Sequence, residues 1–137
     1  MKRTAFSLAA LMLTGCMMFM KAPTDPKAYE HTQASAAQMY RATFTPAESI
    51  KVGKLHQWNI IVTTADGAPI DSAKITVDGG MPQHGHGLPT KPLVTTHLGD
   101  GKHVVEGMKF NMGGWWVVKL TIDGAKGSDV VTFNLKL

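Results

Sequence analysis

The sequence predicts an all-β domain, an immunoglobulin-like β-sandwich of about seven strands. Short segments with alternating apolar and polar residues recur from residue 41 to the C-terminus, and turn-forming Gly, Asp and Pro separate them. Patterns that favour helices are almost absent from this part of the chain. Many short strands with turn signals between them are typical of sandwiches. We therefore expect one β-sandwich domain over residues 41–137.

The N-terminus has the form of a bacterial lipoprotein precursor. A basic pair, Lys2 and Arg3, precedes an apolar stretch from Ala5 to Leu13 that is too short to stay in a bilayer as a spanning helix. The four residues Leu13-Thr14-Gly15-Cys16 match the lipobox, whose cysteine is acylated and becomes the new N-terminus. We therefore expect residues 1–15 to be a signal peptide and Cys16 to carry lipid.

Cys16 is the only cysteine in the chain, which excludes an intrachain disulfide and a cysteine-based zinc site. The alternative to lipidation is a free thiol, buried or reactive. Met17 stands where lipoproteins that stay in the inner membrane of Gram-negative bacteria carry aspartate. This favours an outer-membrane anchor facing the periplasm, and a Gram-positive host stays open as an alternative.

Composition limits the mature protein to one domain without a nucleic-acid partner. Removing residues 1–15 leaves 122 of the 137 residues, enough for one domain. The formal net charge of +4 falls to +2 because Lys2 and Arg3 leave with the signal peptide. The remaining Lys and Arg residues form no cluster of the kind that binds nucleic acid.

Residues 16–40 are expected to form a lipid-anchored tether. The apolar residues 17–20 would sit beside the lipid, and Pro23 and Pro26 favour an extended chain. The alanine-rich stretch from Thr32 to Tyr40 favours a short helix. His31 and Met39 are ligands by type, but in this weakly patterned segment we expect them to be solvated.

The strands follow in order from Arg41. A first strand contains Ala42 and Phe44, and the later strands are expected at 55–64, 73–78, 94–98, 102–110, 115–122 and 131–137. The side chains predicted to face the core are Trp58, Ile60, Val62, Ile75, Val77, Val104, Met108, Phe110, Trp116, Val118, Leu120, Ile122, Val131, Phe133, Leu135 and Leu137. Glu106 has the same parity as Val104 and Met108, which predicts a bulge near Gly107.

The residues with metal-binding chemistry gather in the segment 79–89, which contains Met81, His84 and His86 between glycines and prolines. Neutral imidazole and thioether are ligands for softer transition metals, especially copper. Histidines one residue apart in an extended loop leave the backbone on the same side and are able to converge on one ion. Residues 79–99 contain no acidic residue, which argues against calcium and magnesium.

A second methionine-bearing segment, 107–114, contains Met108 and Met112. We expect the two segments to face one another at one end of the sandwich. Met112, between Asn111 and two glycines, is the better ligand candidate, because Met108 shares its parity with core residues and is equally explained as core packing. The histidines of the first segment also have an alternative role, hydrogen bonding to their own backbone.

These segments resemble the YtkA-like and FixH-like group of small exported or membrane-attached β-sandwich proteins. The resemblance covers roughly residues 41–137 and rests most on two motifs, Met-Pro-x-His at 81–84 and Met-x-Phe-x-Met-x-Gly-x-Trp at 108–116. It implies a β-sandwich and a role in copper handling. FixH itself carries a transmembrane anchor that this sequence lacks, so its role in oxidase assembly does not transfer.

The other histidines and the tryptophans have structural interpretations. His56 is expected at the sandwich edge, and His97 and His103 are expected to pair across the Gly99-Asp100-Gly101 turn, where a second surface metal site is an alternative. Trp115 and Trp116 point to opposite faces. One belongs to the core, and the other is expected to stack over the histidine loop or shield it.

Two functions from different classes fit the sequence, and an enzyme fits poorly. The sequence lacks a serine in a nucleophile-elbow context and a carboxylate beside the paired histidines. The first function is a lipid-anchored copper-binding protein that exchanges the ion with a donor or acceptor protein; it predicts exposed His84 and His86 near Met81 or Met112. The second is a non-metal module that binds an envelope protein or a small ligand; it predicts backbone-bonded histidines and buried or scattered methionines.

Overall fold

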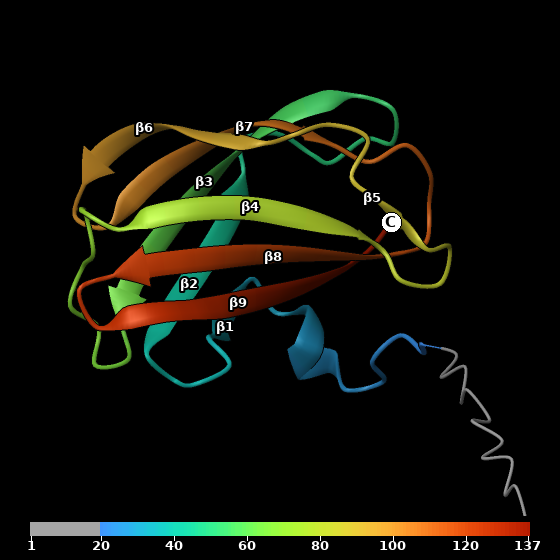
Figure 1. Cartoon of the computed structure of the whole chain (residues 1–137). Helices are drawn as coiled ribbons and strands as arrows, with labels where there is room; N and C mark the ends of the chain where they lie inside the picture. Colours follow the sequence, from blue (N-terminus) through green and yellow to red (C-terminus); the bar gives the residue numbers. More distant parts are fainter. Residues whose placement is uncertain (1–19) are drawn as a thin grey trace, which may run out of the picture.

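In the computed structural model, residues 20–137 form a β-sandwich of two antiparallel sheets (Figure 1). One sheet has five strands in the order β1-β2-β3-β7-β6, and the other has four in the order β5-β4-β8-β9. A short 3₁₀ turn, η1, precedes them at Pro26–Tyr29. The strands are β1 Thr32–Ala34, β2 Tyr40–Pro46, β3 Leu55–Thr64, β4 Lys74–Met81, β5 His86–Gly87, β6 Leu93–Gly99, β7 Lys102–Lys109, β8 Trp115–Gly124 and β9 Gly127–Lys136.

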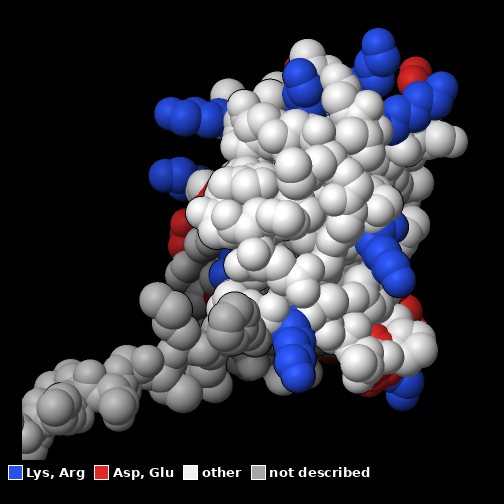
Figure 2. Space-filling view, turned by 90° about the vertical axis from the view of Figure 1, so that its right-hand side faces the viewer, with Lys and Arg blue, Asp and Glu red and all other residues white. Residues whose placement is uncertain are grey.

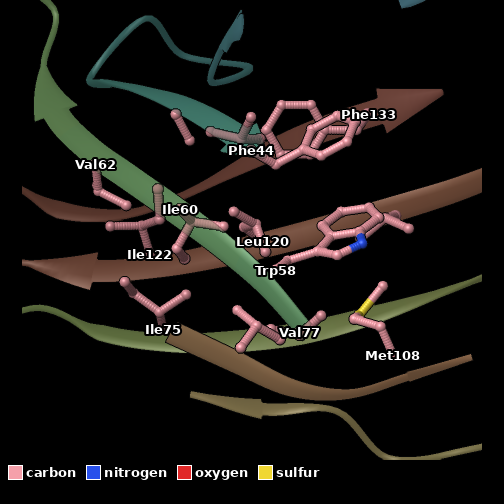
Figure 3. Close-up of a cluster of buried hydrophobic side chains, with 14 of the residues drawn as sticks. Phe44, Trp58, Ile60, Val62, Ile75, Val77, Met108, Leu120, Ile122 and Phe133 are labelled. Carbon is pink, nitrogen blue, oxygen red and sulfur yellow. The ribbon is translucent and has the colours of Figure 1, made fainter. Parts of the chain in front are cut away.

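The predicted fold class is confirmed, and the seven predicted strands are the seven longer strands, β2–β4 and β6–β9. Alternation places one face of each strand between the sheets because successive side chains leave a strand on opposite sides. Trp58, Ile60 and Val62 of β3 are buried against Leu120 and Ile122 of β8 in the core (Figure 3). Phe44 stacks on Trp58 and meets the edge of Phe133, which joins the two sheets at one end of this core.

The tether prediction is wrong for residues 26–40, and the domain begins earlier than residue 41. Residues 32–34 form β1 on the edge of β2 instead of entering a helix, and Ser35 bridges to Val131 of β9. Asp129 accepts hydrogen bonds from the backbone N–H groups of Ala37 (2.9 Å) and Met39 (3.4 Å). A partner some 90 residues away in the sequence therefore overrides the helix propensity of the alanines.

The bulge in β7 is present, and it corrects the predicted core face of that strand. The register of β3 and β7 shifts between His56 and Trp58, whose partners are Met108 and Val105. Glu106 and Gly107 thus stand opposite one residue, and Gly107 has φ +81°. Because the extra residue reverses the alternation, Val105 faces the core before the bulge and Met108 after it. Val104, which we predicted to face the core, is buried (8% exposed), but it lies on the opposite face of the sheet from Val105 and outside the core cluster.

Two ends of the sandwich differ in what their loops carry. At the end that we call the histidine end, the segments 47–54, 82–92 and 110–114 and the C-terminus lie together (Figure 1). The segments 35–39, 65–73, 100–101 and 125–126 make the opposite end. Within residues 20–137, the protein has no helix of the length and apolarity needed to cross a membrane. The signal peptide and Cys16 lie outside the described residues.

Candidate metal-binding loop

The histidine loop, residues 82–87, consists of a tight turn at residues 82–85 and the two-residue strand β5, which pairs back onto β4. The carbonyl of Met81 accepts hydrogen bonds from the N–H groups of both His84 and Gly85, each at 3.0 Å. Gly85 has φ +66°, a conformation that glycine adopts without the steric cost of a Cβ. Leu88 closes the base of the loop by donating to the Gly79 carbonyl at 3.0 Å. The loop backbone is therefore well defined although its outer residues are exposed.

His86 has a ring orientation that leaves one nitrogen free for a ligand. Its Nδ1 lies 3.0 Å from the Gly87 carbonyl, and because a carbonyl only accepts, Nδ1 carries the hydrogen in this contact. In the neutral imidazole the lone pair is then on Nε2. Metal-binding histidines commonly hold their second nitrogen in this way, against a backbone carbonyl or carboxylate.

Trp116 supports the His86 ring from below. The ring centroids are 5.6 Å apart with an interplanar angle of 67°, an edge-to-face arrangement. Trp116 is fully buried and packs against Phe110, so it gives the exposed loop a rigid contact with the core. The indole Nε1–H donates to the carbonyl of Met112 at 3.0 Å. One tryptophan therefore connects the histidine loop to the methionine segment, as the expectation of two facing segments requires.

The two histidine rings lie within reach of a shared ion. Their centroids are 6.0 Å apart and their planes are inclined by 34°. Imidazoles that bind one ion at about 2.0–2.1 Å have centroids up to about 6 Å apart when they approach it from opposite sides. His84 is exposed and His86 half-buried, so this spacing suits an ion held at the surface of the loop.

The three candidate methionines have different environments. Met112 is 39% exposed in the segment beside the loop. Met81 and Met108 belong to the hydrophobic core, with exposures of 1% and 0%. The Met81 side chain packs under the loop, where its methyl group would lie 2.8 Å from a Cβ at Gly114. We therefore retain Met112 as a candidate thioether ligand and remove Met81 and Met108, whose burial in the core keeps them from an ion at the surface.

Among residues 20–137, no group of three or more His, Cys, Asp or Glu side chains is placed to hold a metal ion. The pairing of His97 with His103 is confirmed, because their Nδ1 atoms lie 2.7 Å apart across the β6–β7 hairpin. His103 is fully buried, so this pair is not the surface site considered as an alternative. His56 is half-buried against Phe110, and burial lowers its pKa.

The role of Trp116 at the loop was not predicted from the sequence. The tryptophan outside the core was expected to meet the histidines, whereas the core tryptophan contacts His86. Trp115 is half-buried, donates its Nε1–H to Asn134 at 2.9 Å, and lines a shallow depression with Met20 and His86. Two features of the sequence could have indicated the contact between Trp116 and His86. Trp116 has the same parity as Val118, and it stands at the start of β8, the strand that pairs with β4, which leads into the loop.

Comparison with known proteins gives one match. A family model described as YtkA-like matches residues 34–121, which include β2–β7, the histidine loop and most of β8. Neither a search of curated proteins nor a search of solved structures finds a match.

Proposed function

The chain belongs to the YtkA-like family, and from this membership and the geometry of the loop we propose that it is a copper-binding protein of the cell envelope. The proposed ligands are Nε2 of His86, the imidazole of His84 and the thioether of Met112. The copper handling implied by the sequence resemblance supports the choice of ion. The protein buffers copper, or it exchanges copper with a partner that acts as donor or acceptor. No catalytic role is proposed.

The observation that carries this proposal is the hydrogen bond from His86 Nδ1 to the Gly87 carbonyl. It fixes the tautomer that directs a lone pair away from the backbone, beside a second imidazole at a spacing that one ion bridges. This hydrogen bond and the burial of Met81 and Met108 also meet the expectations of a non-metal module. The free Nε2 of His86 and the exposed side chains of His84 and Met112 favour the metal-binding alternative.

The ligand types favour copper over the other common ions. Two imidazoles and a thioether are a soft donor set, and no carboxylate lies inside residues 79–90 to suit calcium or magnesium. A thioether needs no deprotonation, so it retains its affinity for Cu(I) in mildly acidic surroundings in which imidazole becomes protonated. Zinc, which prefers Cys, His or carboxylate, lacks a third ligand of those types here.

The envelope location rests on the N-terminal sequence. The lipobox ending at Cys16 supports a lipid anchor, and the residue that follows it supports the outer membrane with the domain in the periplasm. An exposed metal site on an anchored domain suits exchange of the ion with a partner at the same membrane.

A Cu(I) competition titration against a chromophoric chelator tests the proposal. Residues 20–137 should bind one Cu(I), and the His84→Ala/His86→Ala variant should lose that binding while keeping its fold. His31→Ala is the matched control, since His31 is exposed and packs against Phe44, away from the histidine loop. No binding by the folded wild type would contradict the proposal.

A further inference from the structure

The histidine end has a distinctive charge distribution. Five basic residues lie in the segments or strand ends that form it: Lys51, Lys54, Lys91, Lys109 and Lys136. The acidic residues of the same segments and strand ends are Glu48 and Glu106. Figure 2 looks onto this end and shows an uncharged middle with basic side chains around its margin. The opposite end carries a balance of both signs, with Asp66, Asp71, Asp100 and Asp123 beside Arg41, Lys74, Lys102 and Lys126.

Exposed apolar side chains gather at the same end. Seven large apolar residues are exposed among residues 20–137, and five of them, Met20, Val52, Leu55, Leu93 and Met112, lie there. Leu55 and Leu93 are each 67% exposed on β3 and β6, on either side of β7. The strand partner of Leu55 is Lys109. Single exposed apolar residues are ordinary, but a group of them among lysines indicates a surface that is covered in use.

The path of the chain brings this end close to a bilayer. Met20 lines a depression together with His86 and Trp115, so the chain leaves the domain at the histidine end. Three residues separate it from Cys16, and the four residue steps from Cys16 to Met20 span at most about 14 Å. A lipid on Cys16 therefore holds the histidine end, and not the opposite end, next to the membrane.

We propose that one side of the histidine end, the β3-β7-β6 side, docks on an anionic lipid surface, with its lysines contacting phosphates and the side chains of Val52, Leu55 and Leu93 entering the headgroup region. His84, His86 and Met112 stay outside the lipid, so the proposed metal site remains open to exchange. Lysines near an anionic bilayer attract it, and their long aliphatic stems let the ammonium groups reach the phosphates while apolar neighbours are buried. The orientation rests on the proposed lipidation of Cys16, whereas the surface itself is measurable without it.

Vesicle flotation with metal-free, unlipidated residues 20–137 tests the proposal; this segment contains the whole core. The domain should float with phosphatidylcholine vesicles that contain about one-third phosphatidylglycerol, and should do so less at high salt. The quadruple variant Lys51→Gln/Lys54→Gln/Lys91→Gln/Lys109→Gln should lower the partition coefficient at least about tenfold. The matched variant Arg41→Gln/Lys74→Gln/Lys102→Gln/Lys126→Gln removes the same charge from the opposite end and should change it much less.

Two further variants separate docking from simple charge attraction. Leu55→Asn/Leu93→Asn should weaken flotation, whereas Ile61→Asn/Leu98→Asn, exposed apolar residues away from the histidine end, should not. Equal losses of vesicle binding in both charge variants, or no binding of the wild type to anionic vesicles, would overturn the proposal. In the second case, an acidic protein would be the partner to test for this surface. Copper and acylation are absent throughout, so failure here leaves the proposed metal site standing, and failure of the metal site leaves this result standing.

Discussion

The Nδ1 atoms of His97 and His103 face one another at 2.7 Å, and one hydrogen lies between them. His103 is fully buried and its Nε2 donates to the Ile70 carbonyl at 2.9 Å. Neutral His103 therefore presents a lone pair on Nδ1, which accepts the Nδ1–H of His97. A proton on Nδ1 of His103 would place two N–H groups head to head, so the folded protein resists protonation of His103.

The free energy of unfolding should fall as the pH is lowered below about 6.5. Burial is the main cause that lowers the pKa of His103, and burial also lowers that of His56. Above the ordinary value of 6.5 both imidazoles are neutral in the folded and unfolded states. Below it, the unfolded chain takes up protons that the folded chain accepts only at lower pH, so acid favours unfolding.

Urea unfolding of residues 20–137 at several pH values between about 5 and 7.5 measures this effect. His103→Gln keeps a donor for Ile70 but does not titrate, and should reduce the slope. His97→Ala should keep most of the slope, because burial outweighs the charge of His97 as a cause. Stability independent of pH in this window would contradict the assignment.

Met112→Leu should weaken Cu(I) binding at least about tenfold, on the scale of losses reported when metal sites are perturbed. The free energy of unfolding should stay within about 0.5 kcal/mol of the wild-type value. Trp116 donates its hydrogen bond to the backbone carbonyl of residue 112, which the substitution keeps, and the Met112 side chain is partly exposed. X-ray absorption on the Cu(I) complex should show a sulfur neighbour that disappears in this variant.

Met108→Leu is the control. It should keep the sulfur signal and cost less than about 1.5 kcal/mol as a conservative core change, and loss of the sulfur signal in Met108→Leu instead would restore Met108 to the site.

Gly80→Ala should destabilise the histidine loop by about 1–3 kcal/mol. A Cβ at Gly80 would collide with the His86 carbonyl and lie 2.9 Å from the Gly87 Cα, so β5 would have to move away from β4. Both thermal stability and Cu(I) affinity should decrease. Gly87→Ala adds the same methyl group to the paired residue, where the nearest atom beyond the adjoining residues, the Gly79 carbonyl oxygen, would be 3.5 Å away. This variant should change neither quantity, and equal behaviour of the two variants would show that the pairing does not hold the loop.

Asp129→Ala should loosen the segment 35–39. The carboxylate accepts hydrogen bonds from the N–H groups of Ala37 and Val130, both at 2.9 Å. The neighbouring Ser35 side chain is the main cause that holds the pKa of Asp129 below its ordinary 3.8, with the backbone donors adding to it. This stabilisation is present above about pH 4 and is lost as the pH falls through the lowered pKa, outside the histidine window.

Limited proteolysis checks the Asp129 prediction. Cleavage within residues 35–39 should be faster in Asp129→Ala than in the wild type, because fewer bonds hold that backbone. Asp123→Ala, which removes an exposed carboxylate from the neighbouring strand β8, is the control and should be cleaved at the wild-type rate. Unchanged cleavage in Asp129→Ala would show that β1 and Tyr40 fix the segment without the carboxylate.

Alternation in the sequence predicted the strands well because it records which face each strand buries. Trp58, Ile60 and Val62 share a parity and a face, and all three are in the core. The local sequence pattern gave a wrong prediction where pairing or a hydrogen bond with a residue far along the chain determined the backbone conformation. The helix propensity of residues 32–40 gave way to pairing with β2 and to Asp129, and the bulge at Gly107 reversed the parity of Val104 and Val105.

The candidate site was only partly predictable for the same reason. Residue type identified His84, His86 and Met112, and the glycines identified the loop. The sequence alone did not reveal the support of His86 by Trp116, which depends on pairing between β4 and β8. Nor did it reveal the group of lysines and apolar residues at the histidine end, because topology, not sequence proximity, brings segments 47–54, 82–92 and 110–114 together.

The most direct test of the copper site is a titration of residues 20–137 with Cu(I), followed by ¹⁵N NMR of the histidine rings, since Cu(I) is diamagnetic. One equivalent should shift Nε2 of His86 and one ring nitrogen of His84, while Nδ1 of His86 stays protonated against Gly87 and the rings of His97 and His103 stay unchanged. Unchanged resonances of His84 and His86 in the presence of bound Cu(I) would contradict the proposed site.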